Sequence, residues 1–372
     1  MKIALITIHK VTNYGAILQA FATTEVLSRF GHVQFIDYQN KYLTSHLHLI
    51  RFKPSVKGIK MLAHDILNFP NRYRFTSKFK KFIREQFDMT AKLSSEDLMK
   101  GRAGDYDVYI CGSDQIWNPK IVNSTLTIDP IYFLAFAEEG ATKISYASSM
   151  GNYIFSDEER QELKFLLQDF HGISIREKEG KELLDEILPD REIRQVVDPT
   201  LLLSGSKWLA TFQSTNTPPE KPYILVYSVP RTQLIRRAIA YFAEKLQLRV
   251  IAIDKMLIPM KKVDLSMRYA GPRDFIELYA NASFVITDSF HGTCFSINFE
   301  KPFICIPATK NANRQEGLLA AVGLRDRIIY EEDGFGSIST DLDYTEPRKK
   351  LEMLRQDSLD YLKQTMSSLA EK

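Results

Sequence analysis

The stretch Phe284–Phe299, which reads FVITDSFHGTCFSINF, decides the fold of this chain. Its first four residues are apolar or β-branched and predict a short buried strand, and Asp288–His291 form a polar break. From Gly292 onward, apolar residues recur at helical spacing, and a second apolar run follows at Phe303–Ile306. Strand, loop, helix and strand in this order form the repeating unit of a doubly wound α/β sheet.

We expect the loop after this strand to lie at the carboxyl edge of a parallel sheet, where open α/β folds bind ligands. The start of the following helix offers backbone N–H groups, which favour an anion. Ser289, His291 and Gly292 therefore predict a site for an anionic group, with the histidine able to transfer a proton. A lone histidine is more often structural. A Ser-His-Asp hydrolase is not favoured, because these residues are too close in sequence and no GxSxG motif is present.

Length and composition indicate a soluble protein of two domains. The chain has 372 residues, with 44% hydrophobic and 26% charged residues. Its three cysteines are scattered, which favours buried thiols in the cytoplasm, and no metal-ligand spacing appears. The N-terminus lacks the pattern of a signal peptide, and no apolar run reaches the ~20 residues that span a bilayer.

The N-terminal region predicts a second βα unit. Lys2–Ile8 is a near-continuous apolar strand, Asn13-Tyr14-Gly15 forms a turn, and a helix is expected over about 16–29. The glycine permits close backbone approach to a ligand, but GxGxxG is absent, which argues against a nicotinamide enzyme. Further strands are expected at 33–38, 106–111, 144–147, 172–175, 195–197, 223–229 and 249–253, and a terminal helix at 348–369.

The domain boundary is predicted near residue 200. Asp198-Pro199 breaks the pattern, and residues 204–222 have the composition of a linker. We expect an N-terminal Rossmann-like domain (1–200) with a helical insertion at about 40–100, a C-terminal Rossmann-like domain (201–345) and a C-terminal helix (346–372). Two doubly wound α/β domains facing across a cleft form the GT-B-like fold, and we expect Asn13, Asp114, Arg176 and His291 to line that cleft.

Two charged residues follow predicted strands in the first half. Asp114 comes after Tyr106–Cys111, and Arg176 comes after Gly172–Ile175. Residues in such places face the ligand crevice of open sheets, and a guanidinium suits phosphate or carboxylate. The structural alternatives are an Asx turn or N-cap for Asp114 and an ion pair with Glu177 or Glu179 for Arg176.

The predicted insertion is basic. Residues 51–84 contain ten lysines and arginines against one acid, Asp65, while the whole chain carries a net charge of only +3. One interpretation is a solvated helical face. The other is peripheral contact with the inner face of the membrane or with a lipid-linked diphosphate. Nucleic acid is not expected, because no motif for reading it accompanies the charge.

Five motifs together carry a resemblance to a known family. They are NYG at 13–15, CGSDQIWNP at 111–119, SIREK at 174–178, VDPTLLL at 197–203 and the loop and helix around His291. In this order, over residues 3 to about 330, the chain resembles the polysaccharide pyruvyl transferases. The resemblance implies a GT-B-like enzyme without cofactor that moves the carboxyethylidene group of phosphoenolpyruvate to two hydroxyls of one sugar, forming a pyruvate ketal. The acceptor would be a surface polysaccharide or its lipid-linked oligosaccharide precursor.

The resemblance also implies roles for particular residues. His291 would be the general acid or a phosphate ligand, and Arg176 would hold the anionic groups of the donor. Asp114 and Asn13 would orient the acceptor or act as base. The remaining predicted substrate-binding residues are their neighbours on the same loops: Tyr14, Gly15, Ser113, Glu177, Ser289, Gly292 and Thr293. The loop SSMG at 148–151 differs from that of some members.

Two other functions stay open at this point. A glycosyltransferase that uses a nucleotide sugar would suit the same fold and the same histidine equally well. A non-catalytic carbohydrate-binding protein of a polysaccharide-assembly complex is the second alternative.

Overall fold

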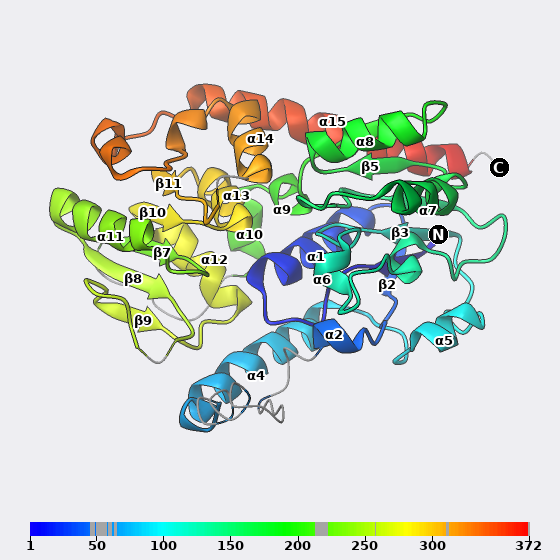
Figure 1. The fold of residues 1–372 in the computed structure, drawn as a ribbon, viewed down its shortest axis with the longest axis horizontal. Helices are drawn as coiled ribbons and strands as arrows, with labels where there is room; N and C mark the ends of the chain where they lie inside the picture. Colours follow the sequence, from blue (N-terminus) through cyan, green and yellow to red (C-terminus); the bar gives the residue numbers. More distant parts are fainter. Residues whose placement is uncertain are drawn as a thin grey trace. The chain divides into compact units, whose positions relative to one another are not determined.

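The computed structural model describes residues 1–44, 49, 58, 62, 65–212, 222–256, 258–309 and 312–370 (Figure 1). By its internal contacts the chain divides into two units. Unit 1 comprises Met1–His46, Ile83–Leu202 and Glu352–Lys372, and unit 2 comprises Leu47–Phe82 and Leu203–Leu351. Residues 56–68 of the predicted helical insertion lie in large part outside the described residues, as do residues 213–221 of the predicted linker.

Unit 1 is built on a parallel sheet with the strand order β2-β1-β3-β4. Two bridges, Ile144–Gly172 and Ser148–Ile175, connect this sheet to the parallel pair of β5 and β6. The chain passes from β1 to one side at β2 and returns to the other side at β3, so the strand order reverses between β1 and β3. The strands are β1 (Lys2–Ile6), β2 (His32–Phe35), β3 (Val108–Cys111), β4 (Lys143–Ser145), β5 (Ile173–Ile175) and β6 (Ile193–Gln195).

The central helix of unit 1 is α1, which is buried along most of its length because apolar and small residues occupy nearly every position. Ser156 is the N-cap of helix α7 and forms a capping box with Glu159. The helices are α1 (Tyr14–Leu27), α2 (Lys41–Thr44), α5 (Ser95–Met99), α6 (Pro119–Val122), η2 (Pro130–Phe133), α7 (Asp157–Leu167), α8 (Lys178–Ile187) and α9 (Pro199–Leu202).

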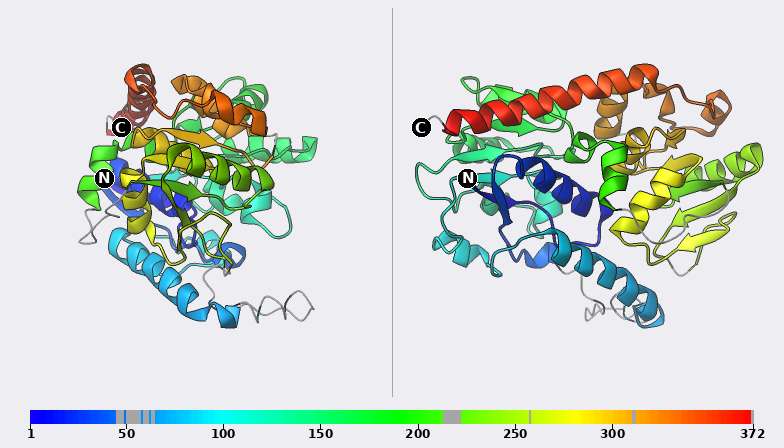
Figure 2. Two further views of the ribbon diagram at one scale, coloured as in Figure 1. Left: turned by 90° about the vertical axis from the view of Figure 1, so that its left-hand side faces the viewer. Right: turned by 180° about the vertical axis from the view of Figure 1, so that it is seen from behind.

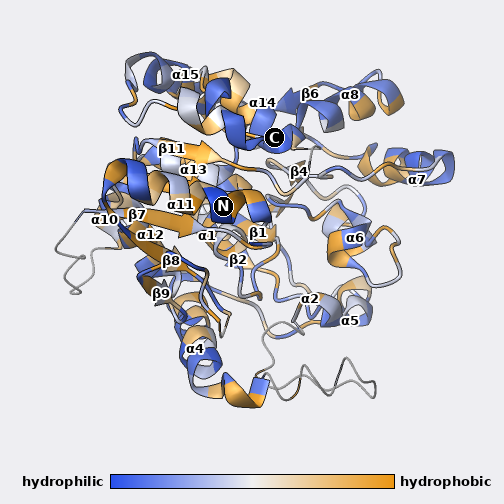
Figure 3. Ribbon diagram, turned by 60° about the vertical axis from the view of Figure 1, so that its left-hand side comes forward, coloured by the Kyte–Doolittle hydropathy of each residue, from blue (hydrophilic) through white to orange (hydrophobic). Residues whose placement is uncertain are grey.

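Unit 2 has a parallel sheet in the order β11-β10-β7-β8-β9, and its order reverses between β7 and β10. Figure 3 shows the predominantly hydrophobic colouring of these strands, as expected for a sheet covered on both faces. The strands are β7 (Tyr223–Tyr227), β8 (Arg249–Ile253), β9 (Leu265–Met267), β10 (Phe284–Thr287) and β11 (Phe303–Cys305). The edge strand β9 escaped prediction, because LSM carries no apolar alternation.

The helices of unit 2 alternate with its strands. Gly271-Pro272 before Asp274 predicts Asp274 as the N-cap of α12, but Asp274 is the third helical residue. Gly271 is the N-cap, and its N–H donates to the Asp274 carboxylate at 2.6 Å. The helices are α10 (Gly205–Thr211), α11 (Gln233–Leu246), α12 (Pro272–Asn281), α13 (Phe290–Asn298), α14 (Asn313–Val322), η3 (Arg325–Arg327) and η4 (Glu332–Ser337).

Two long helices, α4 (Phe69–Gln86) and α15 (Thr345–Ala370), are visible in both views of Figure 2. The sequence places residues 40–100 in the first domain, but by contacts Leu47–Phe82 belongs with unit 2. The reason is side-chain packing: Lys78 pairs with Asp274 at 2.6 Å, and Asn68 donates to the Lys255 carbonyl at 3.2 Å.

The C-terminal part of α15 belongs to unit 1 rather than forming a separate element. Ser358 accepts a hydrogen bond from the Val197 N–H at 3.0 Å, and the Tyr361 hydroxyl donates to the Ser145 carbonyl at 2.9 Å. Among the described residues, no helix is both long enough and apolar enough to cross a membrane.

Candidate functional site

In each unit, polar residues gather where the strand order reverses. Ligands of open α/β sheets bind beside the carboxyl ends of the strands at such a reversal. In unit 1 these are the ends of β1 and β3, and in unit 2 the ends of β7 and β10. Most of the predicted site residues therefore come from the loops that topology favours for a site.

The unit 2 site is built on the tight packing of α13 against β10. A Cβ added to Gly292 would lie 2.2 Å from the Thr287 hydroxyl oxygen and 2.8 Å from that of Tyr279, so only glycine fits. Ser289 is the N-cap, and its hydroxyl accepts from the Gly292 N–H at 3.3 Å. The Thr293 hydroxyl donates to the Ser289 carbonyl at 3.2 Å, which makes the first turn rigid.

Asp288 connects the two strand-end loops of this site. Its carboxylate accepts from the Ser228 hydroxyl and, at 3.1 Å, from the Val229 N–H, and both donors follow β7. Gln315 of α14 donates to the Asp288 carbonyl at 3.2 Å. Burial raises the pKa of Asp288 above its usual value, and the hydrogen bonds from Ser228 and Val229 only partly oppose this.

His291 lies in the first turn of α13 and is 7% exposed. The Phe290 ring contacts the imidazole edge to face, with 5.3 Å between ring centroids. The guanidinium of Arg314, from α14, lies 5.5 Å from the centroid of the same Phe290 ring. The cation of Arg314 thus lies beside the loop of His291. The sequence analysis did not include Arg314 among the site residues.

The unit 1 site begins at the end of β3. Gly112 has φ of +118°, and a Cβ there would lie 2.1 Å from the Tyr146 carbonyl oxygen, so this position requires glycine. Ser113 is fully buried; its N–H donates to Gln19 at 3.2 Å, and its hydroxyl donates to the Ala147 carbonyl at 2.8 Å. The first bond holds the β3 loop against α1, and the second holds it against the loop after β4.

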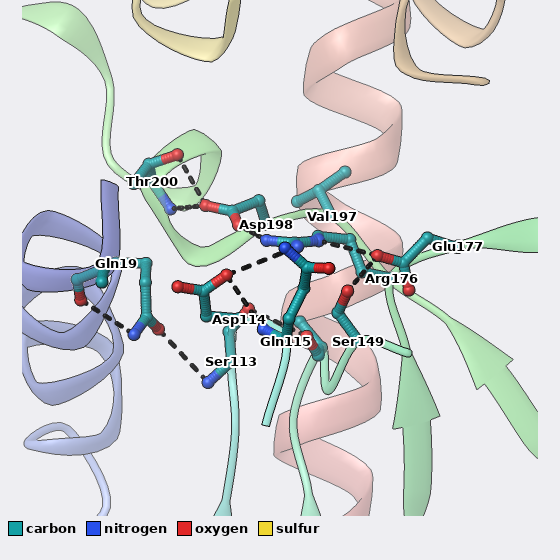
Figure 4. A network of polar contacts seen from close by, with 12 residues as sticks. Gln19, Ser113, Asp114, Gln115, Ser149, Arg176, Glu177, Val197, Asp198 and Thr200 are labelled. Atoms are coloured by element: carbon teal, nitrogen blue, oxygen red, sulfur yellow. Dashed lines mark hydrogen bonds and ion pairs between the residues drawn. The ribbon is translucent and has the colours of Figure 1, made fainter. Parts of the chain in front are cut away.

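Four charged side chains form a buried network at the ends of β3, β5 and β6 (Figure 4). The Arg176 guanidinium contacts Asp198 through Nη1 and lies 3.4 Å from Glu177 through Nε and 3.8 Å from Asp114 through Nη2. Ser149 donates to Glu177, so the loop after β4 also holds the network. Figure 4 shows the three carboxylates pointing toward the same guanidinium.

This network changes how Arg176 can act. Burial disfavours a charged guanidinium, but Asp198, Glu177 and Asp114 outweigh it and raise the pKa of Arg176. One cation faces three carboxylates, so an anion approaching Arg176 would meet an excess of negative charge. The contacts favour a role in which Arg176 positions the carboxylates. Its predicted role as a ligand of the donor stays a prediction.

Asp114 is the member of the network that reaches solvent most, with 13% of its side chain exposed. Its backbone adopts φ of +66°, a conformation that aspartate tolerates better than most residues. The carboxylate also accepts from the Gln115 N–H at 2.9 Å, which is one residue on, whereas an Asx turn uses the N–H two residues on. This local bond therefore does not match either structural alternative for Asp114.

The segment Asn13-Tyr14-Gly15, predicted as a turn, is the start of α1, which begins at Tyr14, two residues earlier than predicted. Asn13 is the N-cap, and its side chain accepts from the Ala16 N–H at 3.2 Å. Asn13 is exposed, whereas Tyr14 and Gly15 are buried in the first turn. The contact explains Asn13 as a helix cap, and its exposure leaves the amide accessible to a ligand as well.

A second histidine lies at the end of β1, where unit 1 reverses its strand order. His9 is 3% exposed; its Nδ1 lies 2.9 Å from the Thr7 carbonyl and its Nε2 lies 3.5 Å from the Asp37 carboxylate. Burial alone would raise the pKa of Asp37, but contacts with His9 and Lys10 outweigh it and hold the pKa below its usual value. Asp37 was not predicted, because its partners are distant in sequence.

The structure thus brings Asp114, Arg176 and Glu177 together within unit 1, with Ser113 beside them. It brings Ser289, His291, Gly292 and Thr293 together within unit 2. The predicted convergence of His291 and Arg176 on one ligand stays a prediction, because the two residues belong to different units. Asp198 joins the unit 1 network and was missed, since Asp198-Pro199 read only as a domain boundary.

Two doubly wound parallel sheets, each with polar groups at its reversal, define a GT-B-like α/β protein. Within this class the chain belongs to the polysaccharide pyruvyl transferase family, whose model matches residues 13–308. This finding confirms the resemblance that the five motifs indicated. A search of curated proteins found no match.

Similar solved structures agree with the fold. The UDP-GlcNAc 2-epimerase from Neisseria meningitidis, solved with UDP-GlcNAc bound, is 11% identical with a TM-score of 0.54, over 99% of this chain and 100% of that chain. The UDP-N-acetylglucosamine 2-epimerase from Rickettsia bellii is 12% identical with a TM-score of 0.52, over 99% and 97% of the two chains. At such identities the likeness shows the fold alone.

Proposed function

We propose that this protein transfers the carboxyethylidene group of phosphoenolpyruvate to two hydroxyls of one sugar, which gives a pyruvate ketal and phosphate. The observation that carries the proposal is His291 on the rigid first turn of α13, at the reversal of the unit 2 sheet, in a chain of this family. The acceptor is a surface polysaccharide or its lipid-linked precursor, and no cofactor takes part.

The reaction needs an acid, and His291 is the residue that we assign to it. A proton added to the methylene carbon makes it a methyl group and leaves positive charge at C2, which one sugar hydroxyl attacks. The phosphate then leaves, and the second hydroxyl closes the ring. Two hydroxyl protons are lost and one is gained by carbon, so the other leaves on the phosphate. The helix start and Arg314 favour an anion beside His291.

In unit 1 we assign Asp114 to the acceptor, as the base or as the group that orients a hydroxyl. Its 13% side-chain exposure makes it the accessible member of the network, and Arg176 lies 3.8 Å from its carboxylate. Arg176 then acts as a positioning residue. An Asp114→Asn variant is expected to lower kcat, and an Arg176→Lys variant to recover part of the activity that Arg176→Met loses.

The test is phosphate release from phosphoenolpyruvate in the presence of galactose- or mannose-containing acceptors. We expect release that depends on the acceptor, and a pyruvate ketal in the product by mass spectrometry. His291→Ala should lower kcat by about 10²- to 10⁴-fold. His32→Ala, which removes an exposed histidine paired with Asp88, is the matched control and should leave kcat unchanged.

Turnover of a nucleotide sugar, with no phosphate release across a broad acceptor panel, would overturn the proposal in favour of a glycosyltransferase. Binding of glycan without turnover of either donor would indicate a carbohydrate-binding protein instead. If His291→Ala keeps full activity in a working assay, the assignment of the acid is wrong even where the reaction is right.

A further inference from the structure

Helix α4 is held to the protein by one face. Phe75, Phe79 and Phe82 recur at spacings of four and three residues and are 6%, 0% and 2% exposed. The Phe82 ring packs on Phe212, with 5.3 Å between centroids, and Lys78 pairs with Asp274 at 2.6 Å. The orientation of α4 about its own axis is therefore set by burial of its phenylalanine face.

Large apolar side chains at the start of α4 are exposed to solvent. Phe69 and Tyr73, in its first turns and away from the phenylalanine face, are 40% and 55% exposed, and Ile66 and Leu67, just before α4, are 58% and 74% exposed. The rings of Phe69 and Tyr73 stack, with 6.3 Å between centroids. We call these four residues the α4 patch. Figure 3 shows hydrophobic colour at that end of the helix.

The helix that carries Phe69 and Tyr73 of the α4 patch is basic. From Ile66 to Arg84 the sequence has six lysines and arginines and no acid. Lys80 is exposed and stands on the same helical stripe as Phe69 and Tyr73, since the spacings of four and seven residues follow the helical repeat. Arg74 is also exposed and lies over the ring of Tyr269 at 5.5 Å.

We propose that the α4 patch docks this protein on an anionic phospholipid bilayer. Aliphatic side chains enter the acyl boundary, the aromatic pair lies at the headgroup level, and the cations face anionic headgroups. Lys78 pairs with Asp274 and Arg72 with Asp65, but Arg74, Lys80, Lys81 and Arg84 on the same helix are exposed. The complementarity of charge favours lipid as the occupant, because these exposed cations suit a surface of uniform negative charge. We place the helix along the interface, because its phenylalanine face is buried in the protein and only its other side is exposed. The inference is independent of the catalytic proposal.

The test is flotation of the purified full-length chain with lipid vesicles. Vesicles of phosphatidylcholine with about one-third phosphatidylglycerol should carry the protein at low salt, and pure phosphatidylcholine vesicles should carry much less. Ile66→Glu with Leu67→Glu should reduce binding by about tenfold or more, and Lys80→Glu by about fivefold or more. Salt near 1 M should weaken binding, because it screens headgroup charge.

Phe165→Glu is the matched control. Phe165 is 69% exposed, a fraction similar to the 74% of Leu67, but it lies on α7, whose first turn is acidic. This variant should bind vesicles like the wild type, and circular dichroism should show all variants folded. Absence of binding to anionic vesicles at low salt, or equal losses from Phe165→Glu and Leu67→Glu, would overturn the proposal. If the wild type does not bind vesicles but Leu67→Glu sediments as a smaller species than the wild type, the patch would instead serve self-association.

Discussion

Replacing Arg176 by methionine tests whether this residue neutralises carboxylates or binds the donor. The guanidinium contacts Asp198 and lies 3.4 Å from Glu177 and 3.8 Å from Asp114, and 3% of the Arg176 side chain is exposed. Without it, Asp198, Glu177 and Asp114 would lose the cation that they share. Removing one partner from a buried ionic group costs about 3–5 kcal/mol, which for a unit of this size lowers Tm by on the order of 10 °C.

Fluorescence can report this loss in unit 1 alone. The chain has two tryptophans, and both are buried: Trp117 in unit 1 and Trp208 in unit 2. In a Trp208→Phe background the unfolding signal comes from Trp117. We expect urea unfolding of the Arg176→Met variant at much lower denaturant, with part of the loss recovered as pH falls, because protonation removes the unpaired negative charges.

Arg160→Met is the control for loss of an arginine. Arg160 pairs with Glu186 at 3.0 Å, but the two side chains are 33% and 66% exposed, so the change should cost about 0–1 kcal/mol. If Arg176→Met unfolds like Arg160→Met at every pH, the network does not stabilise unit 1. Full stability together with a large rise in KM for phosphoenolpyruvate would restore the role of donor ligand and refute our reasoning.

Three further predictions concern single side chains. Gly292→Ala should cost about 1–3 kcal/mol by thermal unfolding, because its Cβ would lie 2.2 Å from a Thr287 oxygen; Gly317→Ala, with no atom within 4 Å, should be neutral or stabilising. The pKa of Asp288 is raised in the folded state, so the free energy of unfolding of the wild type falls as pH rises from the usual aspartate pKa through the raised one. The free energy of unfolding of Asp288→Asn should therefore increase relative to that of the wild type over the same pH range, and a constant difference would contradict this. Asn13→Ala should lower the free energy of unfolding by about 1 kcal/mol, because it removes the helix cap, whereas Asn13→Asp keeps the cap. A higher KM for the acceptor in Asn13→Asp, at unchanged stability, would therefore show that Asn13 binds the ligand.

Much of this protein could be predicted from local sequence. The strand at Phe284–Thr287 and the helix after it follow from an apolar run, an N-cap serine and helical spacing, all of which act over a few residues. The turn at Asn13 and the strand ends at Asp114 and Arg176 were placed by the same local rules. The order of five short motifs indicated the family, which the match over residues 13–308 confirmed.

Tertiary structure alone decided which of these side chains meet. Asp198 follows β6 and Asp114 follows β3, and only the pairing of parallel strands brings both to the guanidinium of Arg176. The same holds for His9 with Asp37, and for Leu47–Phe82, which groups with unit 2 through Lys78 and Asp274. The spacing of hydrophobic residues predicts a strand and its buried face, but it does not specify which strand pairs with it. The partners of a charge at a sheet edge therefore depend on strand order and packing.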